Sequence, residues 1–198
     1  MRMISTDEKA PAGRIVLCTG GARSGKSEFA EHLVLSLDGQ KGYVATSQAF
    51  DDEMKDRIAK HRERRGPQWR NFEIPFKLHE TWATVLSQCD IILVDCLTMY
   101  TTNAMLQDNP DTQEQCHQLE QQLMAELTDV IEQARKAHKT VVFVTNELGL
   151  GIVPDNAMAR HFRDIAGLVN QTVAAKADEV YLTLSGITIE IKSREVVL

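Results

Sequence analysis

Short apolar runs alternate along the chain with longer segments in which apolar residues recur at helical spacing. Three of the runs, "RIVLCT", "DIILVDCL" and "TVVFVTN", are almost continuously aliphatic. A central strand needs such a run when helices cover both of its faces, because neither face meets water. We therefore predict strands at Ile15–Thr19, Gly42–Ala45, Asp90–Asp95, Thr140–Thr145 and Glu179–Leu184.

The segments between these strands predict helices over residues 26–37, 52–65, 76–88, 112–138 and 156–176. Strands that alternate with helices are typical of β-α-β units with right-handed crossovers. They favour an α/β fold in which helices flank a mostly parallel sheet. At the end of the chain, "EVYLTLSGITIEIK" places Ser185 and Gly186 between two runs of alternating apolar residues, which predicts a C-terminal β-hairpin.

No internal repeat or low-complexity linker divides the chain. We therefore expect one domain over residues 14–198, preceded by a polar N-terminal extension at residues 1–13. The net charge of -6 disfavours attraction of the whole molecule to nucleic acid or anionic lipid. No segment reaches the roughly 18 uninterrupted apolar residues of a membrane span. The four cysteines lie far apart without a CxxC pair, so we expect no disulfide framework and a cytoplasmic location.

The strongest motif lies between the first predicted strand and the first predicted helix. It is G-x-x-x-x-G-K-S, formed by Gly20, Gly21, Ala22, Arg23, Ser24, Gly25, Lys26 and Ser27. Its glycines let the backbone curl closely around phosphate groups, and the loop amides and the helix N-terminus then point at the phosphates. In this motif Lys26 reaches the β- and γ-phosphates, and the Ser27 hydroxyl binds Mg²⁺. We predict a nucleoside triphosphate site with magnesium. A glycine turn with an incidental lysine is the alternative.

Such a site also needs an acidic residue at the end of an apolar strand, which holds the Mg²⁺ through water. The run "IILVDC" supplies Asp95 in this position. The alternative is that Asp95 only caps the end of the strand. Asp51 and Asp52 are weaker candidates, because they are placed to cap the helix predicted at residues 52–65.

That helix carries a histidine on or near its inward-facing stripe, since Met54, Ile58 and His61 fall at positions i, i+4 and i+7. Arginines lie one helical turn from the histidine: Arg57, Arg64 and Arg65. Guanidinium groups disfavour a protonated imidazole, so we expect His61 to be neutral and nucleophilic. We hypothesise that it attacks the α-phosphorus of a nucleoside triphosphate. The alternative is a structural histidine on a solvated basic helix, which is our interpretation of His32, His79, His117 and His138.

A third region is dense in candidate functional residues, and we call it the third dense region: "VTNELGLGIVPDNAMARHFRDIAGLVNQ". Asn146 and Glu147 end a strand whose sequence is typical of a buried central strand. The carboxyl ends of such strands are where α/β folds place ligand-binding groups. Gly149 and Gly151 permit a tight loop. The helix that follows begins with charged residues: Arg160, Arg163 and Asp164. A connecting loop with surface ion pairs is the alternative to a binding role.

These segments together resemble the bifunctional adenosylcobinamide kinase / adenosylcobinamide-phosphate guanylyltransferase family of cobalamin biosynthesis. The resemblance runs from about Arg14 to Lys192 and rests on "TGGARSGKS", "YVATSQAFDDEM", "RIAKHRERR", "WRNFE" and the third dense region. It implies a RecA-like core, a homotrimer and two reactions. The first phosphorylates the hydroxyl of the aminopropanol arm of adenosylcobinamide, with GTP or ATP as donor. The second transfers GMP from GTP to that phosphate through a GMP-histidine intermediate.

By position, the resemblance selects His61 as the histidine that carries GMP. Some members have a second histidine where this chain has Lys60, so no neighbour competes for the role. Asp95 is a glutamate in some members, so its reach is shorter here. Besides residues 20–27, the implied nucleotide contacts are Ala45, Thr46, Ser47, Arg62, Glu63, Arg64, Arg65, Glu73 and Asp95.

Two other functions fit the same residues. One is a kinase for another small molecule, in which His61 is structural; it predicts γ-phosphate transfer without a covalent enzyme. The other is a non-catalytic module in which the bound nucleotide sets the assembly state of a partner complex. It predicts tight nucleotide binding with negligible turnover. The preference for guanine rests on the resemblance alone, because no base-reading motif stands out in the chain.

Overall fold

A seven-stranded sheet organises residues 13–48 and 66–196, the part of the chain that the computed structural model describes. Its strands are β1 (Ile15–Gly20), β2 (Lys41–Ala45), β3 (Trp69–Glu73), β4 (Ile91–Asp95), β5 (Thr140–Val144), β6 (Glu179–Leu184) and β7 (Ile187–Glu190). Across the sheet they follow the order β3-β2-β4-β5-β1-β6-β7. Neighbouring strands are parallel except β6 and β7, which form an antiparallel C-terminal hairpin.

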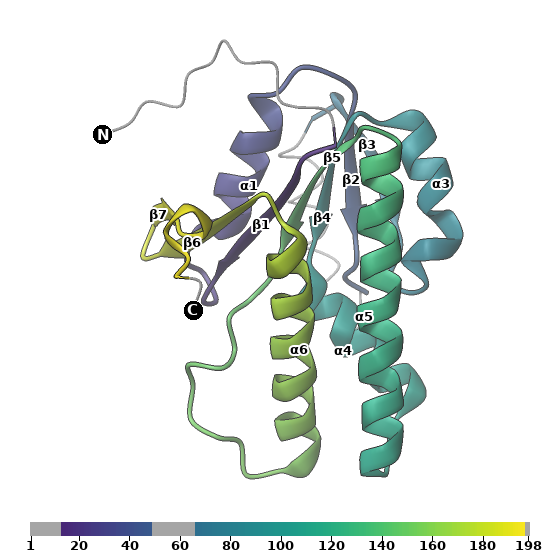
Figure 1. Ribbon diagram of the computed structural model, residues 1–198, viewed down its shortest axis with the longest axis vertical. Helices are drawn as coiled ribbons and strands as arrows, with labels where there is room; N and C mark the ends of the chain where they lie inside the picture. The colour runs from purple at the N-terminus through teal and green to yellow at the C-terminus, as the bar shows by residue number, and fades with distance from the viewer. Residues whose placement is uncertain (1–12, 49–65, 197–198) are drawn as a thin grey trace.

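Helices cover both faces of this sheet (Figure 1). They are α1 (Lys26–Leu35), α3 (Leu78–Gln88), α4 (Leu97–Asp108), α5 (Gln113–Lys136) and α6 (Ala157–Lys176), with a short 3-10 helix, η1 (Lys192–Arg194), near the C-terminus. Alternate residues of a strand point to opposite faces. Val16 and Cys18 of β1 accordingly pack in one cluster with α1, whereas Ile15 and Leu17 pack in another with α3, α4, α5 and α6.

The aliphatic runs form the centre of the sheet, as their sequence requires. Every residue of β1 and of β5 is buried. On the face that α3 and α5 cover, the fully buried Trp82 donates its Nε1 hydrogen to the Val130 carbonyl oxygen at 2.9 Å. This bond satisfies the polar atom of the large side chain and ties the two helices together.

The sequence pattern predicted most of these elements. The five predicted strands agree with the observed ones to within one residue at each end, and the hairpin is confirmed. The helices predicted at residues 26–37, 76–88, 112–138 and 156–176 agree to within two residues. The helix predicted at residues 52–65 lies outside the described residues, as does the N-terminal extension apart from Gly13.

Besides the short 3-10 helix η1, two elements were missed, β3 and α4. Strand β3 is an edge strand in which only Trp69 is buried, so it lacks the apolar run of a central strand. Helix α4 buries polar residues where an amphipathic helix has apolar ones: Thr98, Thr101 and Asn103. Hydrophobic periodicity therefore gives little signal for either element.

All four cysteines are free thiols: Cys18, Cys89, Cys96 and Cys116. Burial raises the pKa of Cys18 to about 12, so this thiol is uncharged at neutral pH and packs as a small apolar group. Among the residues that the structure describes, no helix is long and apolar enough to cross a membrane.

Candidate functional site

The carboxyl ends of the parallel strands meet at one edge of the sheet. The register sets Ala45 of β2 beside both Glu73 of β3 and Asp95 of β4. On the other side of β4, Val144 of β5 pairs with Asp95 and also with Cys18 of β1. Cys18 lies two residues before the predicted phosphate-binding loop at residues 20–27, called the phosphate-type loop below. Parallel pairing thus brings together predicted site residues that lie far apart in the sequence.

The loop from Gly20 to Ser27 leaves this edge through a tight turn that requires glycine. Gly20 has φ +153°, and a Cβ atom there would lie 2.3 Å from the Thr183 carbonyl oxygen and 2.8 Å from Ser24 Oγ. Gly25, at the start of α1, has φ +99° in the left-handed region. Larger residues at these positions would clash or strain the backbone.

Two neighbouring segments brace the loop. The Gly186 amide, in the turn of the β6–β7 hairpin, donates to the Ser24 carbonyl oxygen at 2.8 Å. The Glu147 amide, directly after β5, donates to the Gly20 carbonyl oxygen at 3.1 Å. The C-terminal hairpin and the loop after β5 therefore hold the phosphate-type loop in shape.

The loop presents donors where a phosphate would bind. No side chain of the described residues caps α1, so the amides of its first turn face the loop. Lys26 is 7% exposed, and its Nζ atom donates to the Gly21 carbonyl oxygen at 3.0 Å. Burial lowers the pKa of Lys26, and the nearby Asp95 carboxylate acts in the opposite direction. A phosphate bound in the loop would stabilise the charged form of Lys26, which burial disfavours.

Asp95 ends β4 at the edge of the sheet where this loop begins. It is half-buried, and Tyr43 donates its hydroxyl hydrogen to Asp95 Oδ2 at 3.1 Å. Only β5 separates β4 from β1, the strand that leads into the loop. Ser27 lies in the first turn of α1. A hydroxyl and a carboxylate are the hard oxygen ligands that Mg²⁺ prefers, so Ser27 and Asp95 fit the metal that the motif predicts.

Thr46 clamps the ends of β2 and β4 together. It is fully buried. Its hydroxyl donates to the Cys96 carbonyl oxygen and accepts from the Cys96 amide, both at 2.7 Å. Its own amide donates to the Asp95 carbonyl oxygen at 3.2 Å, and Asn103 Nδ2 donates to its carbonyl oxygen at 2.7 Å. The nucleotide contact predicted for Thr46 stays a prediction, whereas its role in positioning Asp95 follows from these bonds.

A buried polar network fixes the end of β5, and sequence reasoning missed it. The Thr145 hydroxyl donates to Asn170 Oδ1 at 2.7 Å, and Asn170 Nδ2 donates to the Asn146 carbonyl oxygen at 3.1 Å. The Asn146 amide donates to Thr98 Oγ1 at 2.8 Å. The network joins α4, β5 and α6. Glycines and strand ends in the sequence marked Asn146, but nothing marked Thr98 or Asn170, because their partners are distant in the chain.

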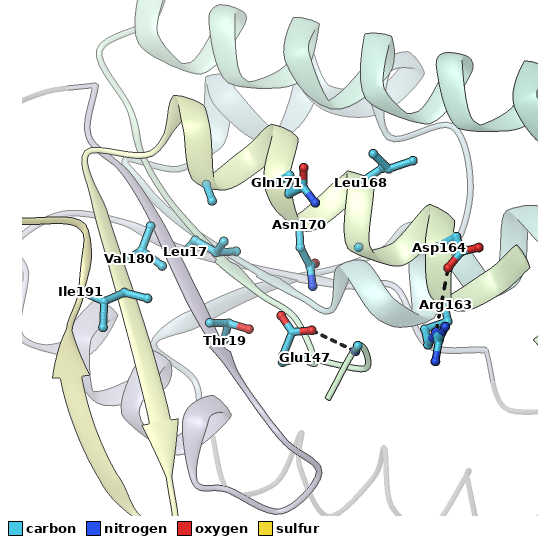
Figure 2. A pocket seen from close by; sticks show the side chains of 13 residues that line it. Leu17, Thr19, Glu147, Arg163, Asp164, Leu168, Asn170, Gln171, Val180 and Ile191 are labelled. Atoms are coloured by element: carbon cyan, nitrogen blue, oxygen red, sulfur yellow. Dashed lines mark hydrogen bonds and ion pairs between the residues drawn. The ribbon is translucent and has the colours of Figure 1, made fainter. Parts of the chain in front are cut away.

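A cavity of about 590 Å³ opens beside this network. Figure 2 shows it between α6, β1, β6 and the loop after β5. Thr19, Glu147, Arg163 and Asn170 are among its polar residues. Its apolar wall comes from Leu17, Leu168, Ala174, Val180 and Ile191.

Several predicted site residues lie outside the described part of the chain: Asp51, Asp52, Arg57, His61, Arg62, Glu63, Arg64 and Arg65. Their segment starts after Gln48, which follows β2 at the same edge as the phosphate-type loop. Of the remaining predicted contacts, Glu73 is exposed at the end of β3 and Ser47 is half-buried after β2. The surface interpretation fits His79, whose Nδ1 pairs with Glu126.

Comparison with known proteins gives a consistent family match. The model described as "Cobinamide kinase / cobinamide phosphate guanyltransferase" matches residues 16–191. The bifunctional adenosylcobalamin biosynthesis protein CobU of Escherichia coli is 44% identical over 181 residues, covering 90% of this chain and 99% of that protein. The corresponding protein of Salmonella typhimurium gives the same identity and coverage. The Pseudomonas aeruginosa protein CobP is 38% identical over 176 residues, covering 89% and 96%.

Solved structures share the fold at low identity. The flagellar accessory protein FlaH from Methanocaldococcus jannaschii has a TM-score of 0.50 and 13% identity, covering 90% of this chain and 76% of that one. The RadB recombinase has a TM-score of 0.51 and 19% identity, covering 87% and 74%. Identities this low show the fold alone. The predicted fold, a mostly parallel sheet flanked by helices with a C-terminal hairpin, is confirmed.

The Thr46 clamp can be tested with two variants. Thr46→Val keeps the shape of the side chain but leaves the Cys96 amide without its partner, so we expect a loss of about 1–3 kcal/mol in the free energy of unfolding. GTP binding should weaken as well, because Asp95 loses its support. Thr46→Ser keeps the hydroxyl and should lose less. Urea denaturation and a GTP titration measure both effects, and equal losses in the two variants would contradict the clamp.

Proposed function

The chain belongs to the cobinamide kinase / cobinamide phosphate guanyltransferase family, and on this premise we propose that it performs both reactions on adenosylcobinamide. The observation that carries the proposal is the 44% identity to a bifunctional relative over 99% of that relative's length. The complete phosphate-type loop with its buried Lys26 supports it, because both reactions break a phosphoanhydride bond of a nucleoside triphosphate.

In the kinase reaction, the amides of residues 20–27 and Lys26 bind the β- and γ-phosphates. The acceptor hydroxyl then attacks the γ-phosphorus. Ser27 and Asp95 would hold Mg²⁺, which supplies charge neutralisation for the departing diphosphate. Thr46 and Tyr43 keep Asp95 in place for that role. GTP is the proposed donor, with ATP as the alternative.

In the guanylyl transfer, His61 attacks the α-phosphorus of GTP and displaces pyrophosphate. The phosphate of adenosylcobinamide phosphate then displaces His61, so that one difficult step becomes two easier ones. The proposed nucleotide contacts for this reaction are Ala45, Thr46, Ser47, Arg62, Glu63, Arg64, Arg65, Glu73 and Asp95. The register that sets Ala45 beside Glu73 and Asp95 supports the part of this set that the structure describes.

Exposed apolar side chains support the proposed homotrimer. Leu150 is 84% and Ile152 is 96% exposed in the loop after β5, and Ile187 is 71% exposed at the start of β7. Exposed apolar groups of this size commonly mark an interface with another protein surface. A cytoplasmic location stays a prediction, which the four free cysteines support.

The covalent intermediate can be tested with GTP labelled at the α-phosphorus. Wild-type protein incubated with this GTP and Mg²⁺ should retain label after denaturation, in an acid-labile and alkali-stable bond. EDTA should prevent labelling, and His61→Ala should lose it entirely. His79→Ala is the matched control, because this exposed histidine pairs with Glu126, and it should label normally. Label that persists in His61→Ala, or no label in wild-type protein that binds GTP with pyrophosphate removed, would contradict the mechanism.

The trimer predicts a solution mass of three times the 22.2 kDa chain in light scattering. Ile187→Lys places a charge among the exposed apolar side chains and should shift the population toward smaller species. Val196→Lys changes another exposed apolar residue, near the C-terminus and 81% exposed, and should leave the mass unaltered. A monomeric wild-type protein at micromolar concentration would refute the trimer.

A further inference from the structure

The cavity beside α6 adjoins the phosphate-type loop directly. Thr19, which lines the cavity, is the residue before Gly20, where that loop begins. Glu147, also on the lining, donates its amide hydrogen to the Gly20 carbonyl oxygen at 3.1 Å. A molecule held in the cavity would therefore lie next to the phosphates of a nucleotide bound in the loop.

Thr19 offers the cavity a hydroxyl that no described residue satisfies. The residue is only 8% exposed, and its Oγ1 atom has no hydrogen-bond partner among the described residues. Buried hydroxyls nearly always have a partner, because leaving one unpaired costs free energy. In Figure 2 the Thr19 hydroxyl points toward the Glu147 carboxylate without a bond between them. A ligand hydroxyl placed there could accept from Thr19 and donate to Glu147.

Hydrogen bonds hold the backbone at Asn146 and Glu147 and also the Glu147 side chain. The preceding residue, Asn146, is held by Thr98 through its amide and by Asn170 through its carbonyl oxygen. The Glu147 amide is held by Gly20, and its Oε1 accepts from the Gly149 amide at 2.9 Å. The carboxylate is therefore preorganised at the cavity, which is what a group that receives a proton needs.

The character of the cavity suits the acceptor better than a nucleotide. The lining carries two carboxylates, Glu147 and Asp164, against one guanidinium, Arg163, whose Nε lies 3.9 Å from Asp164 Oδ1. This excess of negative charge disfavours phosphate groups, whereas the Glu147 carboxylate can accept a hydrogen bond from an alcohol. The apolar wall formed by Leu17, Leu168 and Val180 suits the hydrocarbon part of an acceptor arm.

We propose that this cavity holds the hydroxyl-bearing arm of the acceptor during the kinase reaction, with Glu147 as the catalytic base and Thr19 as a hydrogen-bond donor to the acceptor oxygen. The inference rests on the proposed function. The hydroxyl proton passes to the Glu147 carboxylate while the acceptor oxygen bonds to the γ-phosphorus. The bond from that phosphorus to the β,γ-bridging oxygen breaks, and its electron pair leaves with the nucleoside diphosphate.

Measuring the two reactions side by side distinguishes a catalytic role of Glu147 from a structural one. Adenosylcobinamide needs a base because its hydroxyl must lose a proton, whereas preformed adenosylcobinamide phosphate already carries an anionic nucleophile. Glu147→Gln should therefore lower kcat of the kinase reaction by about 100-fold or more. The same variant should bind GTP normally and transfer GMP to adenosylcobinamide phosphate at a rate within about threefold of wild type. Asp155→Asn, which changes an exposed acid of the same loop, should keep both reactions.

A second variant tests the cavity itself. Thr19→Val removes a hydroxyl that has no partner among the described residues, so the fold should tolerate it. It should raise KM for adenosylcobinamide severalfold and leave the Kd of GTP unchanged.

Kinase activity of Glu147→Gln within fivefold of wild type would overturn the inference. So would a parallel loss of both reactions, which would mark Glu147 as structural. If wild-type protein transfers neither γ-phosphate nor GMP to a corrinoid, the proposed function fails and this inference fails with it. A selective loss of the kinase reaction supports both.

Discussion

Parallel pairing of the strands forces β1 to β6 to end at the same edge of the sheet, and the whole site depends on this constraint. It aligns Glu73, Ala45 and Asp95 across three neighbouring strands and sets the start of the phosphate-type loop two strands away. The loop itself keeps its shape because Gly20 approaches the Thr183 carbonyl oxygen more closely than any side chain would permit. The antiparallel hairpin completes the arrangement, since its turn donates a hydrogen bond to the loop. Fold and site therefore share one set of contacts.

The sequence predicted the parts that carry local signals. Aliphatic runs marked the central strands because those strands are covered on both faces, and glycine spacing marked the loop because few sequences allow such a turn. The polar network of Thr98, Thr145 and Asn170 left no signal. Threonine and asparagine in a helix usually indicate solvent exposure, and only the packing of α4 and α6 against β5 makes them buried partners. The cavity was equally hidden, because its walls come from segments as distant as Leu17 and Ile191.

The two proposed reactions at the phosphate-type loop need different catalytic groups, a base for the kinase reaction and a nucleophile for the guanylyl transfer. The proposed base, Glu147, follows β5, the strand that pairs with β1. The proposed nucleophile, His61, belongs to the segment that follows β2 in the chain, and β2 pairs with β4 on the side away from β5. The proposed base and the proposed nucleophile thus belong to segments that follow different strands in the chain.

We propose that one chain carries out both transfers in sequence on the same acceptor. The most direct measurement incubates the protein with adenosylcobinamide, Mg²⁺, ATP and GTP. Both nucleotides carry one isotope at the γ-phosphorus, and GTP carries a second isotope at the α-phosphorus. Our account predicts that the γ label enters the corrinoid first, and that the final product carries both labels. A product with the γ label alone would indicate a plain kinase, and a corrinoid without either label would indicate a nucleotide-binding module. Either result would contradict the account.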